Sequence, residues 1–522
     1  MIKIVIDNKP VEAQQGETIL KAAQQAGIPI PHLCYHPAFP PEGSCRICLV
    51  EIERLPKLEL ACSTVVREGM KISTQTPRVR EARRGVLEFL LADHPLDCPI
   101  CDKAGECDLQ DYYQEYGAFK SAFKEAKERR EKKIKIGNNL ILDRERCVLC
   151  TRCVRFLTET TKTQELGVFR RGIRSEISTY DAEFVNNNYS GNLVDLCPVG
   201  AITDAQFRFK TRTWFLAPVE SICPLCSQGC NIYVDYHPGF PRVPGTAKIY
   251  RIRPRLNPDV NDHWICDYGR GGYLLLLNDR WDKLVWRKGD RETVVSWEKA
   301  LQILAEKIRT FHLKKDTSKI ALVLSSWLTN EELFLIKKIF KDDLRLERMF
   351  FADPRPGTGD GFLLQAERAP NARGAKEIGF ALNPVRLEDL SQNTNLLIVF
   401  SPFLAELYSP TALKAVFETI GTKVLVTPRA NGLDSLVDFV LPASGMPEKS
   451  GSLTNKNGKI QPFSAVCPSC GDSRPEWSIL VDLARELKMN DDYYRSLTEP
   501  GAILKGLAKE IAFFRKEPLW IS

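Results

Sequence analysis

The chain has 522 residues, of which 27% are charged and 43% are hydrophobic, and its formal net charge is +7. This composition is typical of a globular protein of about three to five domains and argues against a disordered chain. The charge is small for the length and dispersed, so nucleic-acid binding is not indicated. The one basic run, at 124–135, is most simply a solvated helix or a linker.

The sequence shows neither the charged and apolar N-terminal pattern of a secretory signal nor an apolar run of about 18 residues. We therefore expect a cytoplasmic protein that meets a membrane only through partners. Fifteen of the 17 cysteines lie before residue 267. Because they cluster at ligand spacings in a chain without a secretory signal, they indicate metal sites and not disulfides.

Residues 1–78 follow the order of a small β-grasp fold. A strand is predicted at 3–7, a second strand begins at Val11, and a short helix runs between Thr18 and Gly27. The spacing C-x10-C-x2-C-x13-C is the plant-type 2Fe-2S plan with a longer first loop. We expect a 2Fe-2S site with the ligands Cys34, Cys45, Cys48 and Cys62.

Residues 79–117 place a helix-like run, at 79–91, directly before a second ligand set. This set offers one imidazole and three thiols at the spacing H-x3-C-x2-C-x5-C. A lone histidine after a helix is more often a surface residue, but here three thiolates lack a fourth ligand, which favours ligation. Buried small cysteines or zinc ligands are the alternative interpretation. We expect a 4Fe-4S site held by His94, Cys98, Cys101 and Cys107.

Residues 118–215 have the pattern of a two-cluster ferredoxin from which one cluster has been lost. The spacing C-x2-C-x2-C at 147–153 opens the bacterial ferredoxin run. Leu157 stands where the fourth cysteine of that run would be, and Asn187, Ser190 and Leu193 stand where the second run would be. Cys197-Pro198 keeps the thiol that closes the first cluster. We expect a 4Fe-4S site with the ligands Cys147, Cys150, Cys153 and Cys197.

Residues 216–272 contain C-x2-C-x3-C, which a fourth cysteine completes 36 residues later. This spacing fits a further 4Fe-4S site, and a zinc ribbon is the competing interpretation. We expect the ligands to be Cys223, Cys226, Cys230 and Cys266. Two later cysteines, Cys467 and Cys470, form a lone C-x2-C pair. We interpret this pair as structural, with redox chemistry or zinc binding as weaker alternatives.

Residues 273–522 alternate apolar and helical segments. Short apolar runs at 318–326, 395–400 and 423–427 are typical of buried parallel strands. Helical segments at 331–343 and 411–420 alternate with these strands, which predicts βαβ units and a doubly wound α/β domain. The predicted fold class is therefore multidomain, with α+β modules in front of an α/β domain.

Five stretches carry a resemblance to a known family, and they lie at 41–48, 94–111, 143–156, 190–201 and 212–214. On these stretches, residues 1–272 resemble the large iron–sulfur subunit of the peripheral arm of respiratory complex I, the G-type or 75 kDa subunit family of NADH:quinone oxidoreductases. The histidine-containing set also occurs in iron-only hydrogenases and in soluble NAD-linked hydrogenase subunits. The back half, including 448–461, resembles the molybdopterin oxidoreductase domain that this family carries in degenerate form, shortened here.

The resemblance implies an electron-transfer subunit without a catalytic site of its own. Electrons from NADH, taken up by FMN on a neighbouring subunit, would enter at the 2Fe-2S site, pass the Cys147 site and leave from the His94 site towards quinone. The Cys223 site would lie off this line. The implied cofactors are one 2Fe-2S cluster and three 4Fe-4S clusters, without molybdopterin.

The same resemblance implies the partners and the location. The partners would be a flavin- and NADH-binding subunit, a 2Fe-2S subunit and a downstream iron–sulfur subunit. The whole complex would couple electron transfer to proton translocation, with this chain on the cytoplasmic side of the bacterial inner membrane.

Two other functions compete with this one. The first is a molybdenum or tungsten enzyme such as an NAD-linked formate dehydrogenase. No cysteine occurs between Cys266 and Cys467, so the thiolate that often binds the metal is missing, although serine or aspartate could replace it. The second is the electron-transfer subunit of a soluble hydrogenase. That function fits the first 215 residues but leaves the Cys223 set and the α/β domain unexplained.

Overall fold

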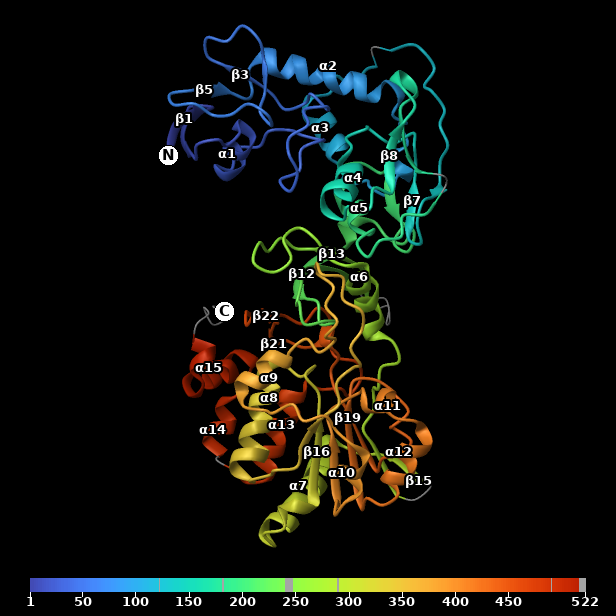
Figure 1. The fold of residues 1–522 in the computed structure, drawn as a ribbon, viewed down its shortest axis with the longest axis vertical. Helices are drawn as coiled ribbons and strands as arrows, with labels where there is room; N and C mark the ends of the chain where they lie inside the picture. The colour runs from blue at the N-terminus through green and yellow to red at the C-terminus, as the bar shows by residue number, and fades with distance from the viewer. Residues whose placement is uncertain (122, 181–182, 240–246, 289–290, 490, 516–522) are drawn as a thin grey trace. The chain divides into compact units, whose positions relative to one another are not determined.

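The computed structural model describes residues 1–121, 123–180, 183–239, 247–288, 291–489 and 491–515. The chain divides into two compact units, Met1–Leu216 and Ala217–Ser522 (Figure 1). No helix among the described residues combines the length and the apolar character needed to cross a membrane.

The first unit begins with the predicted β-grasp domain. Its sheet has the strand order β2-β1-β5-β3-β4. These strands are β1 (Ile2–Ile6), β2 (Lys9–Ala13), β3 (Leu49–Ile52), β4 (Glu59–Leu60) and β5 (Lys71–Ser73). Helix α1 (Ile19–Gln25) begins where predicted, because the hydroxyl of Thr18 accepts a hydrogen bond from the amide of Lys21. The hairpin and the helix predicted from the sequence are thus confirmed.

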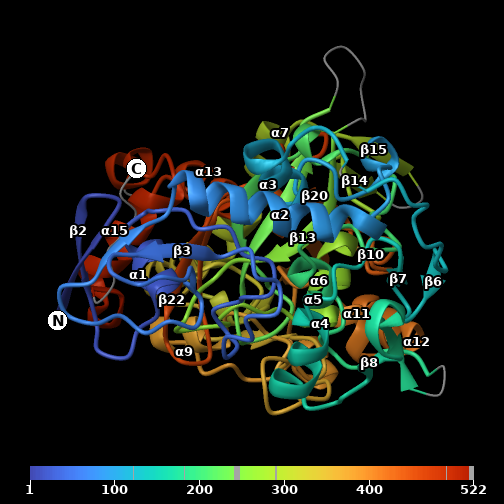
Figure 2. The same ribbon diagram turned by 90° about the horizontal axis from the view of Figure 1, so that it is seen from above.

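Helix α2 (Pro77–Asp93) links the β-grasp domain to the second ligand set. It contains the predicted run 79–91 and starts with Thr76 as N-cap and Pro77 in the first turn. In both views α2 lies alongside α3 (Asp108–Tyr116) (Figures 1 and 2). Arg83, fully buried in α2, donates 2.9 Å hydrogen bonds to the hydroxyl of Tyr116 and to the carbonyl of Leu49. This arginine therefore fixes α2 to helix α3 and to strand β3.

The basic run at 124–135 forms a linker, and the helix that the sequence also allowed is not present. In its described residues the only regular element is β6 (Ile134–Lys135). Lys127 donates hydrogen bonds to the carbonyls of Leu91 and Ala92, the latter at 3.0 Å. These carbonyls belong to the last turn of α2, whose free acceptors and partial negative charge attract cations. The basic side chains of the linker are thus used to bind other parts of the fold.

The ferredoxin-like module is built on a three-stranded sheet with the order β10-β7-β6. Strands β7 (Leu140–Leu142) and β10 (Ile202–Asp204) flank the ligand-bearing segments. A separate hairpin pairs β8 (Leu166–Phe169) with β9 (Glu176–Thr179). Among its described residues the module has the α-helices α4 (Arg152–Arg155), which continues as a π-helical turn over Phe156–Thr160, and α5 (Asn192–Leu196).

The second unit starts with an antiparallel sheet of order β11-β12-β13. Its strands are β11 (Ala217–Ile222), β12 (Asn231–His237) and β13 (Lys248–Pro254), followed by helix α6 (Asp267–Leu274). A seven-stranded sheet of order β15-β14-β20-β19-β18-β16-β17 follows in the described residues. These strands are β14 (Val285–Lys288), β15 (Arg291–Val294), β16 (Ile320–Leu324), β17 (Met349–Phe351), β18 (Leu396–Val399), β19 (Thr422–Thr427) and β20 (Phe439–Pro442).

Helices cover both faces of the seven-stranded sheet. Ile320, Leu322 and Leu324 of β16 pack into one apolar core, and Ala321 and Val323 pack into the other, as the alternation of side chains along a strand requires. On the first face lie α7 (Trp297–Leu313), α8 (Asn330–Ile336), α9 (Ala372–Ile378), α13 (Glu476–Glu486), α14 (Asp491–Ser496) and α15 (Pro500–Glu510). On the second lie α10 (Leu387–Ser391), α11 (Leu404–Leu407) and α12 (Pro410–Phe417).

The predicted doubly wound domain is confirmed. Strands β16, β18 and β19 coincide with the three predicted apolar runs, and strands β16 to β20 pair in parallel. Helix α8 and its π-helical continuation Lys337–Asp343 fill the predicted helical segment. The sequence did not predict the edge hairpin of β14 and β15, which pairs antiparallel to β20, nor the hairpin of β21 (Gly451–Thr454) and β22 (Ile460–Phe463).

Candidate metal centres

The four cysteines of the β-grasp domain lie in two close pairs. The neighbouring thiol of Cys45 lowers the pKa of Cys34 to about 4, and the neighbouring thiol of Cys48 lowers the pKa of Cys62. The pKa values of Cys45 and Cys48 are raised by the same neighbouring thiols and by burial. Gly43, directly before Ser44 and Cys45, has a φ of 72° that a side chain would strain. Two close thiol pairs fit a group of two irons with four cysteine ligands.

His94 caps the C-terminal end of α2. Burial lowers the pKa of its imidazole to about 4, an effect that Arg146 and Lys127 reinforce and Asp97 opposes. Its Nδ1 is buried and has no hydrogen-bond partner in the described part of the chain. A neutral imidazole with an unpartnered nitrogen has the protonation state and the free lone pair that a metal ligand needs.

The thiols that accompany His94 differ in exposure. Cys98 is exposed, whereas Cys101 and Cys107 are buried, and burial raises the pKa of Cys107 to about 12. Cys107 is the residue directly before α3. A Cβ at Gly200 would overlap the sulfur of Cys101, so only glycine allows the loop after Cys197 to pack there. The Cys101 thiol is thus held between its own loop and the Cys197 loop.

The third set is gathered around one small cavity, which is lined by Cys147, Cys150, Cys153 and Cys197. Burial raises the pKa values of Cys147 and Cys150 to about 12 and that of Cys153 further. Leu149 and Thr151 adopt φ values of 51° and 58°, which turn the backbone around the sulfurs, and the amide of Leu149 lies 3.4 Å from the sulfur of Cys147. Four thiols around one cavity suit a cluster, because bound iron stabilises the thiolates that burial disfavours.

The fourth set lies in the second unit, where β11 turns into β12. The amide of Cys223 donates a 2.8 Å hydrogen bond to the carbonyl of Cys230, and the sulfur of Cys266 accepts one of 3.3 Å from the amide of Gly269. A Cβ at Gly269 would lie 3.1 Å from the Cys223 sulfur and 3.4 Å from that of Cys266. Cys226 is buried with these three.

In the described residues, no three His, Cys, Asp or Glu side chains are placed to share a single metal ion.

Cys467 and Cys470 lie in the loop before α13. Cys467 packs against the apolar cluster that contains Cys223 and Cys230, and its amide donates a 3.1 Å hydrogen bond to the carbonyl of Pro447. Burial raises the pKa of Cys467 to about 12 and raises that of Cys470. These surroundings hold both side chains as neutral thiols.

Short contacts connect the three ligand sets of the first unit. Arg155, two residues after Cys153, donates hydrogen bonds to the carbonyls of Cys34 and, at 3.0 Å, Pro40. On the other side, the amide of Asp108, next to Cys107, donates a 3.0 Å hydrogen bond to the carbonyl of Pro198, next to Cys197. The Cys147 set therefore contacts the loops of both other sets.

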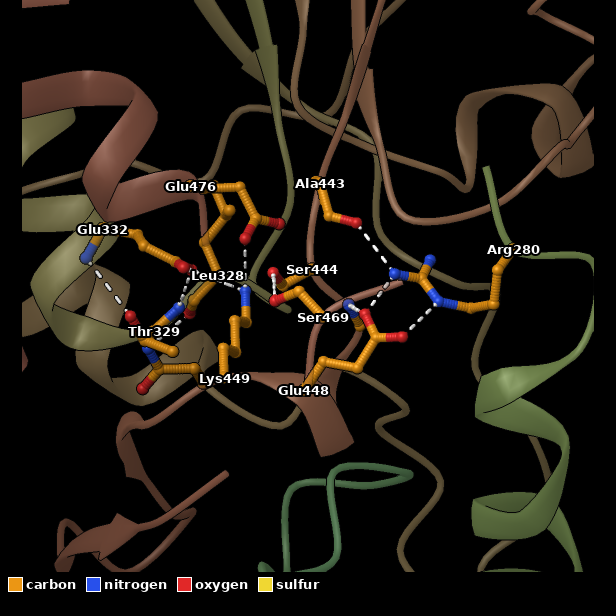
Figure 3. A network of polar contacts seen from close by, with 12 residues as sticks. Arg280, Leu328, Thr329, Glu332, Ala443, Ser444, Glu448, Lys449, Ser469 and Glu476 are labelled. Carbon is orange, nitrogen blue, oxygen red and sulfur yellow. Dashed lines mark hydrogen bonds and ion pairs between the residues drawn. The ribbon is translucent and has the colours of Figure 1, made fainter. Parts of the chain in front are cut away.

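A buried network of charged residues lies in the α/β domain (Figure 3). The ammonium of Lys449 donates to both carboxylate oxygens of Glu332, at 2.9 and 3.0 Å, and to Glu476 at 2.8 Å. Beside it, Arg280 forms an ion pair with Glu448 through a 2.9 Å hydrogen bond from Nε. Sequence reasoning missed this network. The only local signal was the capping box of Thr329 and Glu332 at the start of α8.

A cavity of about 320 Å³ opens beside this network, at the carboxyl ends of β16, β18 and β19. Strand order reverses between β16 and β18, and such a switch point is where open α/β sheets place their ligand crevices. Trp327 and Phe403, whose rings lie 5.1 Å apart, line the apolar side, and Lys449 and Glu476 line the polar side. The charges on the polar side are already paired with each other.

Four family models match parts of the chain. They are the 2Fe-2S iron-sulfur cluster binding domain at 1–77, the NADH-ubiquinone oxidoreductase-G iron-sulfur binding region at 83–121, the ferredoxin-like domain of NADH-quinone oxidoreductase subunit 3 at 137–203 and the molybdopterin oxidoreductase family at 432–486. They confirm the predicted fold class, a succession of iron–sulfur modules in front of a molybdopterin-oxidoreductase-like α/β domain. The last match covers only part of that domain.

Curated relatives are similar over the larger part of the chain. The NADH-ubiquinone oxidoreductase 75 kDa subunit of Reclinomonas americana is 42% identical over 339 residues, and the NADH-quinone oxidoreductase G subunit of Rickettsia felis is 38% identical over 341 residues. The mitochondrial NADH dehydrogenase [ubiquinone] iron-sulfur protein 1 of Solanum tuberosum is 43% identical over 307 residues. The matches cover 65%, 65% and 59% of this chain and 47%, 49% and 40% of those proteins. The chain spans about half the length of the curated relatives it matches.

Two solved structures match parts of the chain at low overall similarity. An NAD+-reducing [NiFe]-hydrogenase has a TM-score of 0.38 and 29% identity, over 41% of this chain and 91% of that one. Acetylene hydratase from Pelobacter acetylenicus has a TM-score of 0.36 and 10% identity, over 54% of this chain and 72% of that one. Neither likeness is close enough to carry an argument about function.

Proposed function

Since the chain is a homologue of the G-type and 75 kDa iron–sulfur subunits of NADH-quinone oxidoreductase, we propose that it is the electron-transfer subunit of such a complex. In this role it carries electrons from NADH, received through FMN on a partner subunit, towards quinone. The complex as a whole couples this transfer to proton translocation. The chain itself contributes ligands and positioning groups and no catalytic site.

We propose four iron–sulfur sites, one in each of four modules, at 1–78, 79–117, 118–215 and 216–272. Bound clusters supply one-electron transfer at these sites. The 2Fe-2S ligands are Cys34, Cys45, Cys48 and Cys62, and the three 4Fe-4S sets are His94 with Cys98, Cys101 and Cys107; Cys147, Cys150, Cys153 and Cys197; and Cys223, Cys226, Cys230 and Cys266. The paired thiols, the unpartnered His94 nitrogen and the thiol-lined cavity support this assignment. The domain at 273–522 holds no molybdopterin in this proposal.

The observation that carries the proposed function is the central position of the Cys147 set in the first unit. Its loops touch the Cys34 loop through Arg155 and the Cys107 loop through the bond between Asp108 and Pro198. Because the Cys147 set contacts both other sets, electrons that pass between those two sites would pass through it. This supports the order 2Fe-2S site, Cys147 site, His94 site. The Cys223 set belongs to the other unit and lies off this line in our proposal.

We propose three partners for the complex: the flavin- and NADH-binding subunit, a 2Fe-2S subunit and a downstream iron–sulfur subunit. In this assembly the chain is peripheral, on the cytoplasmic side of the bacterial inner membrane, and meets the membrane only through other subunits. The alternative of a soluble hydrogenase subunit leaves the fourth ligand set and the α/β domain without a role.

The test is reconstitution of electron transfer from NADH. The purified chain, with its clusters and free of flavoprotein, should not reduce an artificial acceptor with NADH. Addition of the flavin subunit should produce that activity and reduce the iron–sulfur signals of this chain. NADH oxidation by the isolated polypeptide, or cluster signals that stay oxidised with the flavin subunit and NADH present, would exclude the proposed role.

A further inference from the structure

Arg152 is a buried arginine that contacts residues beside three ligand sets. Only 7% of its surface is exposed, and it lies in α4 between Thr151 and Cys153. Its Nη1 lies 3.5 Å from the carbonyl of Leu196, the residue before Cys197, and its Nη2 lies 3.5 Å from the carbonyl of His32, two residues before Cys34. The guanidinium therefore joins the loops of separate sets.

The positive charge of Arg152 is poorly compensated by the protein. The nearest carboxylate is that of Asp108, at 3.9 Å, and this side chain is itself 41% exposed. Nε is buried without a hydrogen-bond partner among the described residues, and the two carbonyl contacts are long for hydrogen bonds. A buried charge with such weak partners is costly unless another charge of opposite sign lies beside it.

Arg146, in the same module, is a buried arginine whose positive charge is balanced by nearby carboxylates. Its Nε and Nη2 donate to the carboxylate of Asp97 at 3.3 and 2.8 Å, and Asp143 lies 3.5 Å away. Arg152 has no comparable partner among the described residues. Arg152 lies directly before Cys153 and two residues after Cys150, and it contacts the carbonyl of the residue before Cys197. Its charge lowers the pKa of Cys150 against the larger effect of burial.

We propose that Arg152 is the buried counter-charge of the Cys147 site and sets its reduction potential. This inference rests on the proposed function, since it needs a cluster at that site. A 4Fe-4S group with four thiolate ligands carries negative charge, which grows by one unit on reduction, so a fixed cation beside it favours the reduced state. Arg152 is not a ligand in this proposal and acts on the site through its charge.

The experiment compares Arg152→Met, which removes the charge and keeps much of the length, with Arg152→Lys, which keeps the charge. Both are made in the full chain with its clusters assembled anaerobically. The EPR signal of the Cys147 site is identified as the one that a Cys147→Ser variant alters, and its midpoint potential is measured by redox titration. The exposed Arg171→Met serves as the matched control.

We expect the midpoint to fall in Arg152→Met, to stay near wild type in Arg152→Lys and to be unchanged in Arg171→Met. Asp108→Asn should shift it in the opposite direction, because the charge of Arg152 is then offset less. This variant also tests the inference if Arg152→Met loses iron. An unchanged midpoint in Arg152→Met, an equal fall in Arg152→Lys, or no rise in Asp108→Asn would overturn the inference. Absence of any such signal from the wild-type chain would instead count against the proposed function.

Discussion

The guanidinium of Arg155 donates a hydrogen bond to the main-chain carbonyl of Cys34, 121 residues earlier in the chain. A second hydrogen bond, of 3.0 Å, reaches the carbonyl of Pro40, and the guanidinium stacks over the ring of Phe39 at 5.3 Å. One side chain next to the Cys147 set therefore holds the long first loop of the 2Fe-2S domain. That loop has ten residues between Cys34 and Cys45 and little regular structure of its own.

Arg155→Met should release this loop. Two charge-assisted hydrogen bonds and a stacking contact are lost, at a cost of about 2 to 4 kcal/mol to the local structure. Hydrogen exchange should speed up in residues 33–45 and stay unchanged in β1 and β2. The exposed Arg171→Met is the matched control, and equal protection of residues 33–45 in wild type and Arg155→Met would contradict the prediction.

Metal analysis of the purified chain should give about fourteen iron atoms, two from one 2Fe-2S cluster and four from each of three 4Fe-4S clusters. Molybdenum and tungsten should be absent. About ten irons with one zinc would show that the Cys223 set is a zinc ribbon. Stoichiometric molybdenum would contradict the assignment of the α/β domain.

His94→Cys should keep a 4Fe-4S cluster but lower its midpoint potential, because an anionic thiolate replaces a neutral imidazole and disfavours the added electron. His94→Ala should leave the cluster labile or convert it to a three-iron form. EPR-monitored redox titration of both variants measures these changes and decides whether His94 is a ligand. The same signal and potential in His94→Ala as in wild type would show that His94 is not a ligand.

Lys449→Met should destabilise the protein by about 3 to 5 kcal/mol, because it leaves the buried carboxylate of Glu332 without its cation and removes the hydrogen bond to Glu476. Lys414→Met, at a largely exposed lysine, should have little effect. Adding Glu332→Gln to Lys449→Met should restore part of the lost stability. Denaturant unfolding of the four proteins measures this, and no recovery in the double variant would argue against uncompensated charge as the cause.

Glu476 should make stability depend on pH. Burial raises the pKa of its carboxyl from 4.5 to about 8, so the folded protein keeps a proton that the unfolded chain releases near pH 4.5. This contribution to stability is complete below that pH and is lost as pH rises through about 8. The apparent unfolding temperature should therefore fall between pH 5 and 8, and Glu476→Gln should reduce the fall. Parallel curves for both proteins would contradict this.

Local signals in the sequence were enough for much of the fold. Thr18 and Gly27 delimit α1 because capping is decided by neighbouring residues. The runs around β16, β18 and β19 have apolar centres without alternation because parallel strands are buried on both faces. The cysteine spacings likewise identify candidate ligands, since short loops bring sequence neighbours together.

Long-range charge pairing could not be read in the same way. Lys449 stands in a polar segment that resembles a surface loop, yet it is buried, because its partners come from 117 and 27 residues away. The basic run at 124–135 shows the same difficulty, since the carbonyls that Lys127 binds belong to a distant helix end. Sequence pattern shows which residues are charged, but only the fold shows what neutralises them.

The packing of Gly200 on the Cys101 sulfur also affects the order in which the cysteine pockets can form during synthesis of the chain. Residues 1–77 supply every strand of the β-grasp sheet, so the sheet can form while the ribosome is still adding the rest, and its cysteine loop is held once Arg155 has emerged. Gly200 can pack against the Cys101 sulfur only after residues 197–200 have left the ribosome. The same four residues include Cys197, the last thiol of the third set. A nascent chain that ends before Cys197 therefore carries one finished pocket and two unfinished ones, which become ready for iron together.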